Sequence, residues 1–295
     1  ALSSDVKFKS SRGPEVNDGC ATAGTLEIPI GGKKKPAWIV DGQQRALALS
    51  KSKRMDLPIA VSAFIADEIE LQRDQFLRVN SSKNLPPGLI TELLPEVSTT
   101  LPAKLAARKM PSAICDWLNQ DETSPLKGLI KRSSTSEEDR KMAVIADTSI
   151  VKMIEESLSS PSGCLFPYRN IATGETDFDG ICRILTTYWT AVRVVFPDAW
   201  GKVPAKSRLM HGCGIRAMGR LMDRIMPSIK VHNKTAVTEA EKELGRISGD
   251  CRWTSGRWEE LGGLKWNEVQ NVPRHINLLS SVLIRAYTQA WGKDG

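Results

Sequence analysis

Hydrophobic and polar residues alternate in two different ways along the chain. Over the first hundred residues, short β-prone runs at 25–30, 36–40 and 58–64 alternate with segments of helical pattern. Helices are predicted directly after Gly42 and over about 67–80. The glycines and lysines between the first two runs suit a hairpin loop. This region is therefore predicted to fold as strand, tight turn, helix, strand and helix.

The pattern becomes almost wholly helical after residue 100. Apolar residues recur there at helical spacing, and loops rich in Ser, Gly and Pro separate the segments. The predicted helices are 102–119, 139–158, 178–195, 207–226, 236–247 and 272–291. The change near Pro102 predicts an α+β protein with one domain over 1–100 and a helical domain over 101–295. The same change could equally divide two halves of one compact domain.

Length and composition define the broad class of the protein. The chain has 295 residues, of which 41% are hydrophobic and 25% charged, so it can bury a core of ordinary size. No segment approaches the roughly 20 uncharged apolar residues of a membrane helix, which predicts a soluble protein with no membrane partner. The first residues show neither an initiator Met nor the pattern of a secretory signal. The numbering is therefore expected to begin inside a longer protein.

Cysteine and histidine usage argues against disulfide and metal chemistry. The six cysteines lie far apart and form no CxxC pair, so reduced and mostly buried thiols in the cytoplasm are expected. None of the three histidines lies four residues from another or beside a cysteine, which argues against histidine-based metal catalysis. The sequence contains no P-loop, and GCGIRA at 212–217 imitates a dinucleotide fingerprint without a convincing strand before it.

The net charge of +7 is concentrated in the second part of the chain. Lys and Arg number 13 against 12 Asp and Glu over 1–100, but 28 against 22 over 101–295. On one predicted helix, Arg216, Arg220 and Arg224 recur every four residues and form one cationic stripe. An ordinary amphipathic helix explains this pattern. Mutual repulsion within the stripe is easier to tolerate opposite phosphates or a partner's carboxylates, so contact with DNA or a partner is the alternative.

The segment WIVDGQQR at 38–45 carries the strongest chemical signal. A β-prone run ends at Val40, Gly42 permits a sharp turn, and a helix is predicted to start within two residues. Such a corner directs the free N–H groups of a helix N-terminus at an anion. Arg45 adds a planar fork for two phosphate oxygens, and Asp41 could hold a divalent cation or orient a water. These parts suit a small nucleotide-phosphate site, although such a corner is more often a cap and a turn.

Two segments of the chain resemble motifs of a known family. WIVDGQQR, followed by a strand pattern and then FLRVNSSKNLP at 76–86, resembles the DGQHR-domain family of the ParB and sulfiredoxin-like superfamily. FPDAW at 196–200, the helix start at Gly212 and the segment 253–271 are similar to its DpdB branch and, more distantly, its DndB branch, accessory proteins of bacterial DNA-modification operons. The resemblance implies a small ParB/sulfiredoxin-like mixed β-sheet domain with an extended, mostly helical C-terminal part.

The resemblance also implies ATP binding and hydrolysis, with Mg²⁺ as the expected metal ion. Asp41, Gly42, Gln43 and Arg45 match the family's motif. Catalysis is then expected of Asp41, Gln44 and Arg45, nucleotide contacts of Gly42, Gln43 and Arg45, and metal binding of Asp41. Gln44 departs from the motif, which has His there. A glutamine cannot carry a proton as histidine does, but it could orient an attacking water.

Asn80 and Lys83 match the second motif, at the end of a predicted helix. The resemblance implies that Lys83 neutralises phosphate charge and that Asn80 binds the cation or the nucleotide. The simpler interpretation is a helix C-cap and a solvated lysine.

Three functions follow from these residues and the resemblance. The first is an ATPase subunit that acts with a transglycosylase-like partner to insert a 7-deazaguanine base into DNA. The second is a DNA-binding transcriptional regulator of a phosphorothioation-type modification operon. A nuclease is the third. A homo-oligomer is compatible with the sequence.

Overall fold

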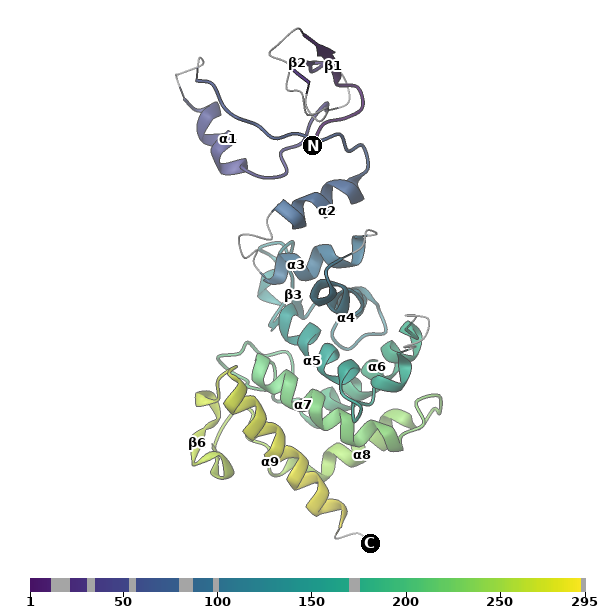
Figure 1. Cartoon of the computed structure of the whole chain (residues 1–295). Coiled ribbons are helices and arrows are strands. Elements are labelled where there is room, and N and C mark those ends of the chain that lie inside the picture. Colours follow the sequence, from purple (N-terminus) through teal and green to yellow (C-terminus); the bar gives the residue numbers. More distant parts are fainter. Residues whose placement is uncertain are drawn as a thin grey trace. The chain divides into compact units, whose positions relative to one another are not determined.

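In a computed structural model, the chain divides into two compact units. The N-terminal unit comprises residues 1–85 and 96–100, and the helical unit comprises 86–95 and 101–295. Both are drawn in Figure 1. Small sheets occur in both units and helices dominate the second, so the protein belongs to the α+β class. The structure describes residues 1–11, 22–30, 35–52, 57–79, 87–97, 101–169 and 176–292.

The N-terminal unit contains a two-stranded antiparallel sheet. Its strands are β1 (Lys7–Ser10) and β2 (Gly24–Glu27). Lys7 faces Glu27 with opposite charge, and next to this pair Phe8 faces Leu26. Such cross-strand pairs stabilise an antiparallel ladder. β2 overlaps the first predicted run, but its partner is β1 rather than the run 36–40, so the predicted hairpin is wrong.

The predicted runs 36–40 and 58–64 do not form strands. Leu2 lies between them and makes one isolated antiparallel bridge with Ala37 and one parallel bridge with Ile65. The chain turns two residues after Leu2, so each ladder stops after a single pair. Ala37 of the first run and Ile65, the residue directly after the second run, therefore make single bridges to the start of the chain, which sequence periodicity alone could not indicate.

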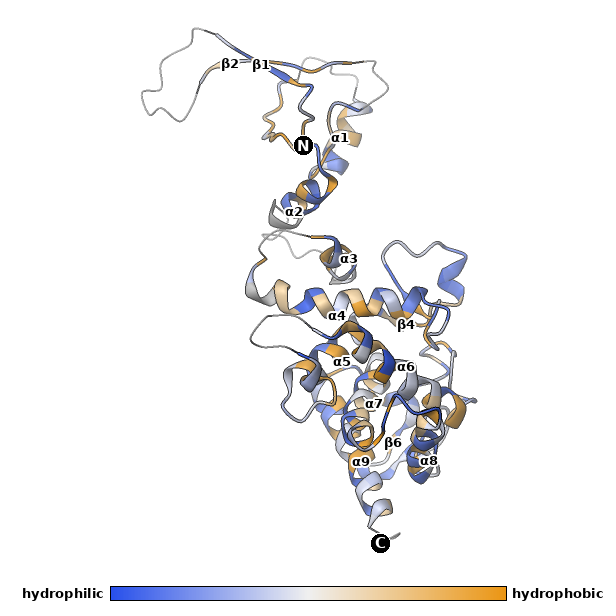
Figure 2. Ribbon diagram, turned by 90° about the vertical axis from the view of Figure 1, so that its right-hand side faces the viewer, coloured by the Kyte–Doolittle hydropathy of each residue, from blue (hydrophilic) through white to orange (hydrophobic). Residues whose placement is uncertain are grey.

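Two helices of the N-terminal unit confirm predicted segments. They are α1 (Gln43–Ser50), directly after Gly42, and α2 (Ile69–Val79), within the predicted range 67–80. None of the residues of α1 is buried, although the helix carries hydrophobic residues, coloured orange in Figure 2. Local signals, the turn at Gly42 and the Ala and Leu content, therefore account for α1 better than packing does.

The helical unit combines seven α-helices with two small sheets among its described residues. The helices are α3 (Pro87–Leu93), α4 (Ala103–Gln120), α5 (Asp147–Ser159), α6 (Phe178–Val195), α7 (Gly212–Ile225), α8 (Ala236–Ser248) and α9 (Pro273–Trp291). The parallel pair is β3 (Ile130–Lys131) with β4 (Ile145–Ala146), and the antiparallel pair is β5 (Arg257–Trp258) with β6 (Leu264–Lys265). Within the described residues, none of the helices has the length and apolar character needed to cross a membrane.

Most helices predicted after residue 100 are confirmed, and α6 has the predicted bounds. Two helices begin later than predicted. The helix predicted from residue 139 begins at Asp147, because Ile145 pairs with β3. The helix predicted from residue 207 begins at Gly212, because the Arg208 amide donates a 2.8 Å hydrogen bond to the Trp253 carbonyl. Both delays come from partners distant in sequence, and the short helix α3 was not predicted.

The core of the helical unit lies between its helices. α5 packs on α4 and α7, α7 on α9, and α6 on α8, and α7 and α9 can be followed as neighbours in Figure 1. Tyr188 and Trp189 of α6 are fully buried, and the Tyr188 hydroxyl donates to the Met218 carbonyl at 2.8 Å. A Cβ at Gly219 would lie 2.2 Å from Met153 Cγ. Gly219 therefore permits the close approach of α5 and α7.

The cysteines that the structure describes are free thiols. Burial raises the pKa of Cys115, Cys182, Cys213 and Cys251 to about 12. These thiols are therefore protonated at neutral pH and are poor nucleophiles. Cys20 lies outside the described residues.

Candidate functional site

The predicted nucleotide corner lies in the N-terminal unit, where the chain turns into α1. Gly42 has φ 80° and ψ 22°, in the left-handed region that favours glycine. A Cβ at this position would lie 3.2 Å from Arg45 Nη2. The absence of a Cβ at Gly42 therefore permits both the left-handed turn and the close approach of the Arg45 side chain, which folds back over the glycine.

Asp41 connects the turn to the helix through both carboxylate oxygens. Its Oδ1 accepts a 2.7 Å hydrogen bond from the Gly42 amide, and its Oδ2 lies 3.4 Å from Arg45 Nη2. The side chains of Asp41 and Arg45 are 48% and 78% exposed. An exposed ion pair at this spacing contributes only about 0.3–0.5 kcal/mol. Asp41 and Arg45 can therefore exchange partners easily.

The two glutamines of the corner have different surroundings. Gln43 Nε2 donates to the carbonyls of Ile39 and Val40, at 3.2 and 3.3 Å. This side chain ties α1 to the preceding segment, so the predicted nucleotide contact of Gln43 is left to its backbone amide and its side-chain oxygen. Gln44 is exposed, and its side chain is accessible to a water molecule.

Among the residues that the structure describes, no side chain caps the N-terminus of α1. The Ala46 amide donates to the Gly42 carbonyl at 2.8 Å and so begins the hydrogen bonding of the helix. The three preceding amides, of Gln43, Gln44 and Arg45, have no acceptor within the helix. Together they carry about half a positive charge, to which the guanidinium of Arg45 adds a full one. The corner is therefore an arrangement that can bind an anion.

The residues of the corner could hold the phosphates of a nucleotide together with one metal ion. Mg²⁺ usually takes one or two protein carboxylates together with substrate phosphates, so Asp41 alone meets that need. Within the ranges that the structure describes, no group of three or more His, Cys, Asp or Glu side chains could hold a metal ion. Asn80 and Lys83, the predicted partners of the corner, lie outside the described residues.

A carboxylate of the same chain lies opposite the arginine stripe of α7. Arg216 pairs with Glu156 of α5, and Arg220 Nε lies 3.3 Å from the same carboxylate. Arg220 Nη1 also donates to Asn277 Oδ1 of α9 at 2.7 Å. The repulsion that suggested an external anion is therefore relieved within the unit by Glu156. Arg224 is the exposed member of the stripe.

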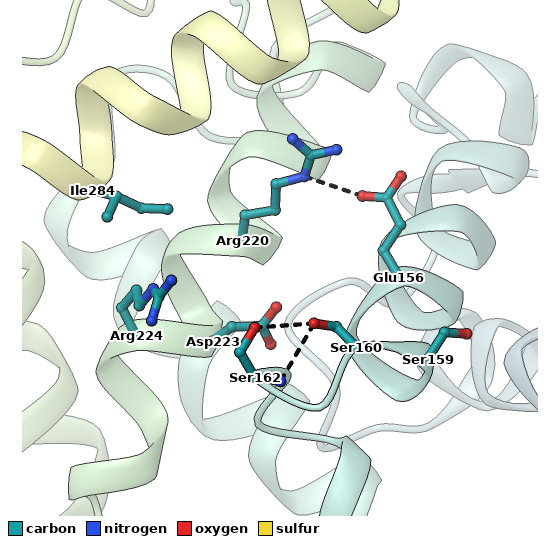
Figure 3. Close-up of a pocket in the computed structure, with 8 residues that line it drawn as sticks. All are labelled: Glu156, Ser159, Ser160, Ser162, Arg220, Asp223, Arg224 and Ile284. Atoms are coloured by element: carbon teal, nitrogen blue, oxygen red, sulfur yellow. Dashed lines mark hydrogen bonds and ion pairs between the residues drawn. The ribbon is translucent and has the colours of Figure 1, made fainter.

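A cavity of about 490 Å³ lies between α5, α7 and α9 beside these arginines. We call it the arginine–serine pocket. Its lining residues are Glu156, Ser159, Ser160, Ser162, Arg220, Asp223, Arg224 and Ile284. Figure 3 shows the Arg220 guanidinium at one edge and the hydroxyl groups of Ser160 and Ser162 at the opposite edge.

Sequence reasoning found the arginines of this pocket but not their surroundings. Glu156 lies 60 and 64 residues before the two arginines that it binds, so helical spacing could not connect them. The composition of the segment 159–163 indicated a loop and nothing more.

Asp223 forms an inner wall of the pocket and is held by its own chain. Its Oδ1 accepts hydrogen bonds from Ser157 Oγ at 2.5 Å and from the Cys164 amide at 3.0 Å. Burial raises the pKa of the Asp223 carboxyl, while these two hydrogen bonds and the charge of Arg224 act in the opposite direction. Asp223 therefore fixes the loop after α5 against α7.

The dinucleotide-like segment 212–217 is a helix start shaped by packing. His211 Nδ1 accepts a 3.4 Å hydrogen bond from the Cys213 amide and caps α7. A Cβ at Gly214 would lie 2.1 Å from the Arg208 carbonyl oxygen. Close backbone contact therefore accounts for this glycine without a ligand.

Comparisons with protein-family models, with curated proteins and with solved structures found no significant match to this chain. The DGQHR resemblance therefore rests on the residues quoted for it. ATP, DNA and the transglycosylase-like partner, which the resemblance implies, enter the argument as proposals.

Proposed function

We propose that this chain binds and hydrolyses ATP at the Asp41–Arg45 corner, as a subunit of a bacterial DNA-modification system. The observation that carries the proposal is the uncapped N-terminus of α1 beside an exposed guanidinium. Open amides and a guanidinium recognise phosphate oxygens through both hydrogen bonds and charge. The DGQHR resemblance supports ATP as the nucleotide and a ParB/sulfiredoxin-like identity for the N-terminal unit.

Nucleotide binding at this corner involves the exchange of one ion pair. Arg45 leaves Asp41 and pairs with a phosphate, and Asp41 would then be free to hold Mg²⁺. Each charge then keeps an opposite charge beside it. When bound, Mg²⁺ neutralises the charge that develops on the phosphates. The high exposure of the Asp41–Arg45 pair supports this exchange, because a solvated pair is easily replaced.

Gln44 is the residue proposed to orient the attacking water. The water oxygen bonds to the γ-phosphorus, and the bond from that phosphorus to the β–γ bridging oxygen breaks. ADP and inorganic phosphate leave, and a proton passes to solvent. Because a glutamine cannot accept that proton, Gln44 acts by position alone. We therefore expect slow turnover by the isolated chain.

The proposed partners are DNA and a transglycosylase-like enzyme that inserts a 7-deazaguanine base. ATP turnover then supplies energy for a conformational or DNA-handling step rather than for the base exchange itself. Similarity to the DpdB branch supports this role, and the free cysteines of the described residues support a cytoplasmic location.

Steady-state ATP hydrolysis by the full chain tests the proposal. Arg45→Ala and Asp41→Ala are each expected to lower turnover at least tenfold, because one removes a phosphate contact and the other the proposed metal ligand. Lys51→Ala is the matched control, since it removes a positive charge from the other end of α1. Equal turnover in wild type, Arg45→Ala and Asp41→Ala would remove the site.

A DNA-binding regulator is the second candidate function. The observation that favours it is the excess of 28 Lys and Arg over 22 Asp and Glu in residues 101–295. This role predicts binding that prefers operator-like duplexes and weakens steeply with salt. Equal affinity for operator-like and random duplexes at one salt concentration would eliminate it.

A further inference from the structure

We propose that the arginine–serine pocket binds a small phosphate monoester that carries hydroxyl groups, such as a sugar phosphate or a nucleoside monophosphate. The pocket is formed within the helical unit and shares no residue with the Asp41–Arg45 corner. Its volume of about 490 Å³ lies within the range of small-molecule sites, about 300–1,000 Å³.

The two acids of the pocket are already engaged by groups of the same chain. The charged residues that line the pocket are two arginines, Arg220 and Arg224, and two acids, Glu156 and Asp223, so their formal charges balance. Glu156 is already shared by Arg216 and Arg220, and Asp223 already accepts two hydrogen bonds from its own chain. Arg224 makes no hydrogen bond or ion pair with any described residue, and only its charge acts on the Asp223 carboxyl. Its donors are therefore open to a ligand.

The two arginines that line the pocket retain hydrogen-bond donors. Arg220 uses Nε and Nη1 for Glu156 and Asn277, and its Nη2 has no hydrogen bond to a described residue. Arg224 keeps the whole donor set of its guanidinium for a ligand. A phosphate monoester offers three terminal oxygens and a charge of about −1.5 to −2 at neutral pH, so it can accept from both arginines.

The opposite edge of the pocket suits hydroxyl groups rather than a second anion. The hydroxyl oxygens of Ser160 and Ser162 lie 2.9 Å apart. α5 ends at Ser159, and a helix C-terminus carries about half a negative charge, which disfavours an anion there. Ligand hydroxyls can donate to such oxygens, and Ile284 adds an apolar surface for a carbon skeleton. The phosphate is therefore directed to α7 and the hydroxylated part to the loop after α5.

Isothermal titration calorimetry on the full chain tests this orientation. All titrations use Arg45→Ala as the background, so that the corner cannot contribute. Ribose 5-phosphate and AMP are the two ester probes, and at least one is expected to bind at least tenfold more tightly than inorganic phosphate, with ribose and adenosine not binding. Arg224→Gln is expected to weaken ester binding at least tenfold. Arg183→Gln, at an exposed arginine of α6, is the matched control and should change nothing.

Three results would overturn the proposal. The first is that neither ester binds, and the second is that ester affinity is unchanged in both Arg224→Gln and Arg220→Gln. The third is that inorganic phosphate binds as tightly as the esters. Arg224→Gln is expected to fold normally because Arg224 is exposed, and its melting temperature verifies this. ATP hydrolysis with an intact corner should be unaffected by Arg224→Gln, so the two proposals can fail independently.

Discussion

The two units of the chain differ in how they accommodate hydrophobic residues. In the helical unit, Tyr188 and Trp189 are fully buried within a core to which α4–α9 all contribute. In the N-terminal unit, Ile30 and Val61 are 95% and 79% exposed, and α1 buries none of its residues. Burial of apolar surface is the main favourable term in folding. Most of the folding free energy of the described residues is therefore located in the helical unit.

This difference separates two kinds of site. The Asp41–Arg45 corner is formed by neighbours in sequence, so its geometry depends little on a core. The arginine–serine pocket is formed by three helices and exists only while those helices are packed. Substitutions in the core of the helical unit should therefore affect the pocket and leave the chemistry of the corner intact.

The largest expected effect comes from the core of α6. Trp189 makes ring contacts with Tyr188 and Trp200, at centroid distances of 5.5 and 6.3 Å. Trp189→Ala is expected to lower the free energy of unfolding by about 3–5 kcal/mol. Leu47→Ala in α1, at a side chain 51% exposed, should change it by less than about 0.5 kcal/mol. Urea unfolding followed by circular dichroism measures both, and equal losses would contradict the contrast between the units.

Two glycines of the helical unit give an intermediate test. Gly219→Ala places a Cβ 2.2 Å from Met153 Cγ, so a loss of about 1–3 kcal/mol in the free energy of unfolding is expected. Gly245→Ala in α8 meets nothing within 4 Å and should stabilise the helix by about 0.5–1 kcal/mol. Thermal unfolding should therefore give opposite shifts in Tm. A rise in Tm for Gly219→Ala as well would mean that α5 and α7 are not in close contact at this glycine.

The smallest predicted effect is a pH dependence from the cap of α7. Burial, with the charge of Arg208 added, lowers the pKa of His211 to about 4, below the unfolded value of about 6.5. The unfolded chain therefore binds the proton first, and stability present above pH 6.5 is lost as the pH falls through 4. Allowing for partial exposure, the loss is roughly 1–2 kcal/mol.

His211→Asn is the control for this pH dependence, because asparagine can still cap α7 but does not titrate. As the pH falls from 6.5 to 4, the unfolding free energy of His211→Asn should rise relative to that of the wild type. This comparison cancels the contributions of Asp147 and Asp223, whose raised pKa values act in the opposite direction. Parallel pH profiles for the two proteins would show that His211 is not the responsible group.

The sequence predicted those parts of the fold whose signals are local. α6 has the predicted bounds, because a long amphipathic pattern follows Asp177, whose side chain caps the helix by accepting from the Gly180 amide at 2.8 Å. The starts of α5 and α7 were misplaced, because contacts with β3 and with Trp253 decide them. The strands predicted over 36–40 and 58–64 failed for the same reason, since both segments meet Leu2.

The same distinction applies to the candidate sites. The left-handed turn at Gly42 and the helix after it follow from a local sequence signal, and their role in nucleotide binding stays a prediction. The engagement of Gln43 with the preceding carbonyls was not predicted. Helical spacing found the stripe of α7, whereas its neutralisation by Glu156 required the packing of α5 on α7.

Glu156 pairs with two arginines of α7 at once, and this pairing limits which anions the helix can bind. A row of arginines along one helix would adhere to any polyanion, including cellular RNA, whatever its sequence or shape. By pairing with Arg216 and Arg220, one carboxylate leaves Arg224 as the exposed arginine of the row, and Nη2 of Arg220 keeps no hydrogen bond to a described residue. The open donors of α7 are thus confined to Arg220 and Arg224, where a compact ligand can reach them and a long polymer cannot bind along the whole row.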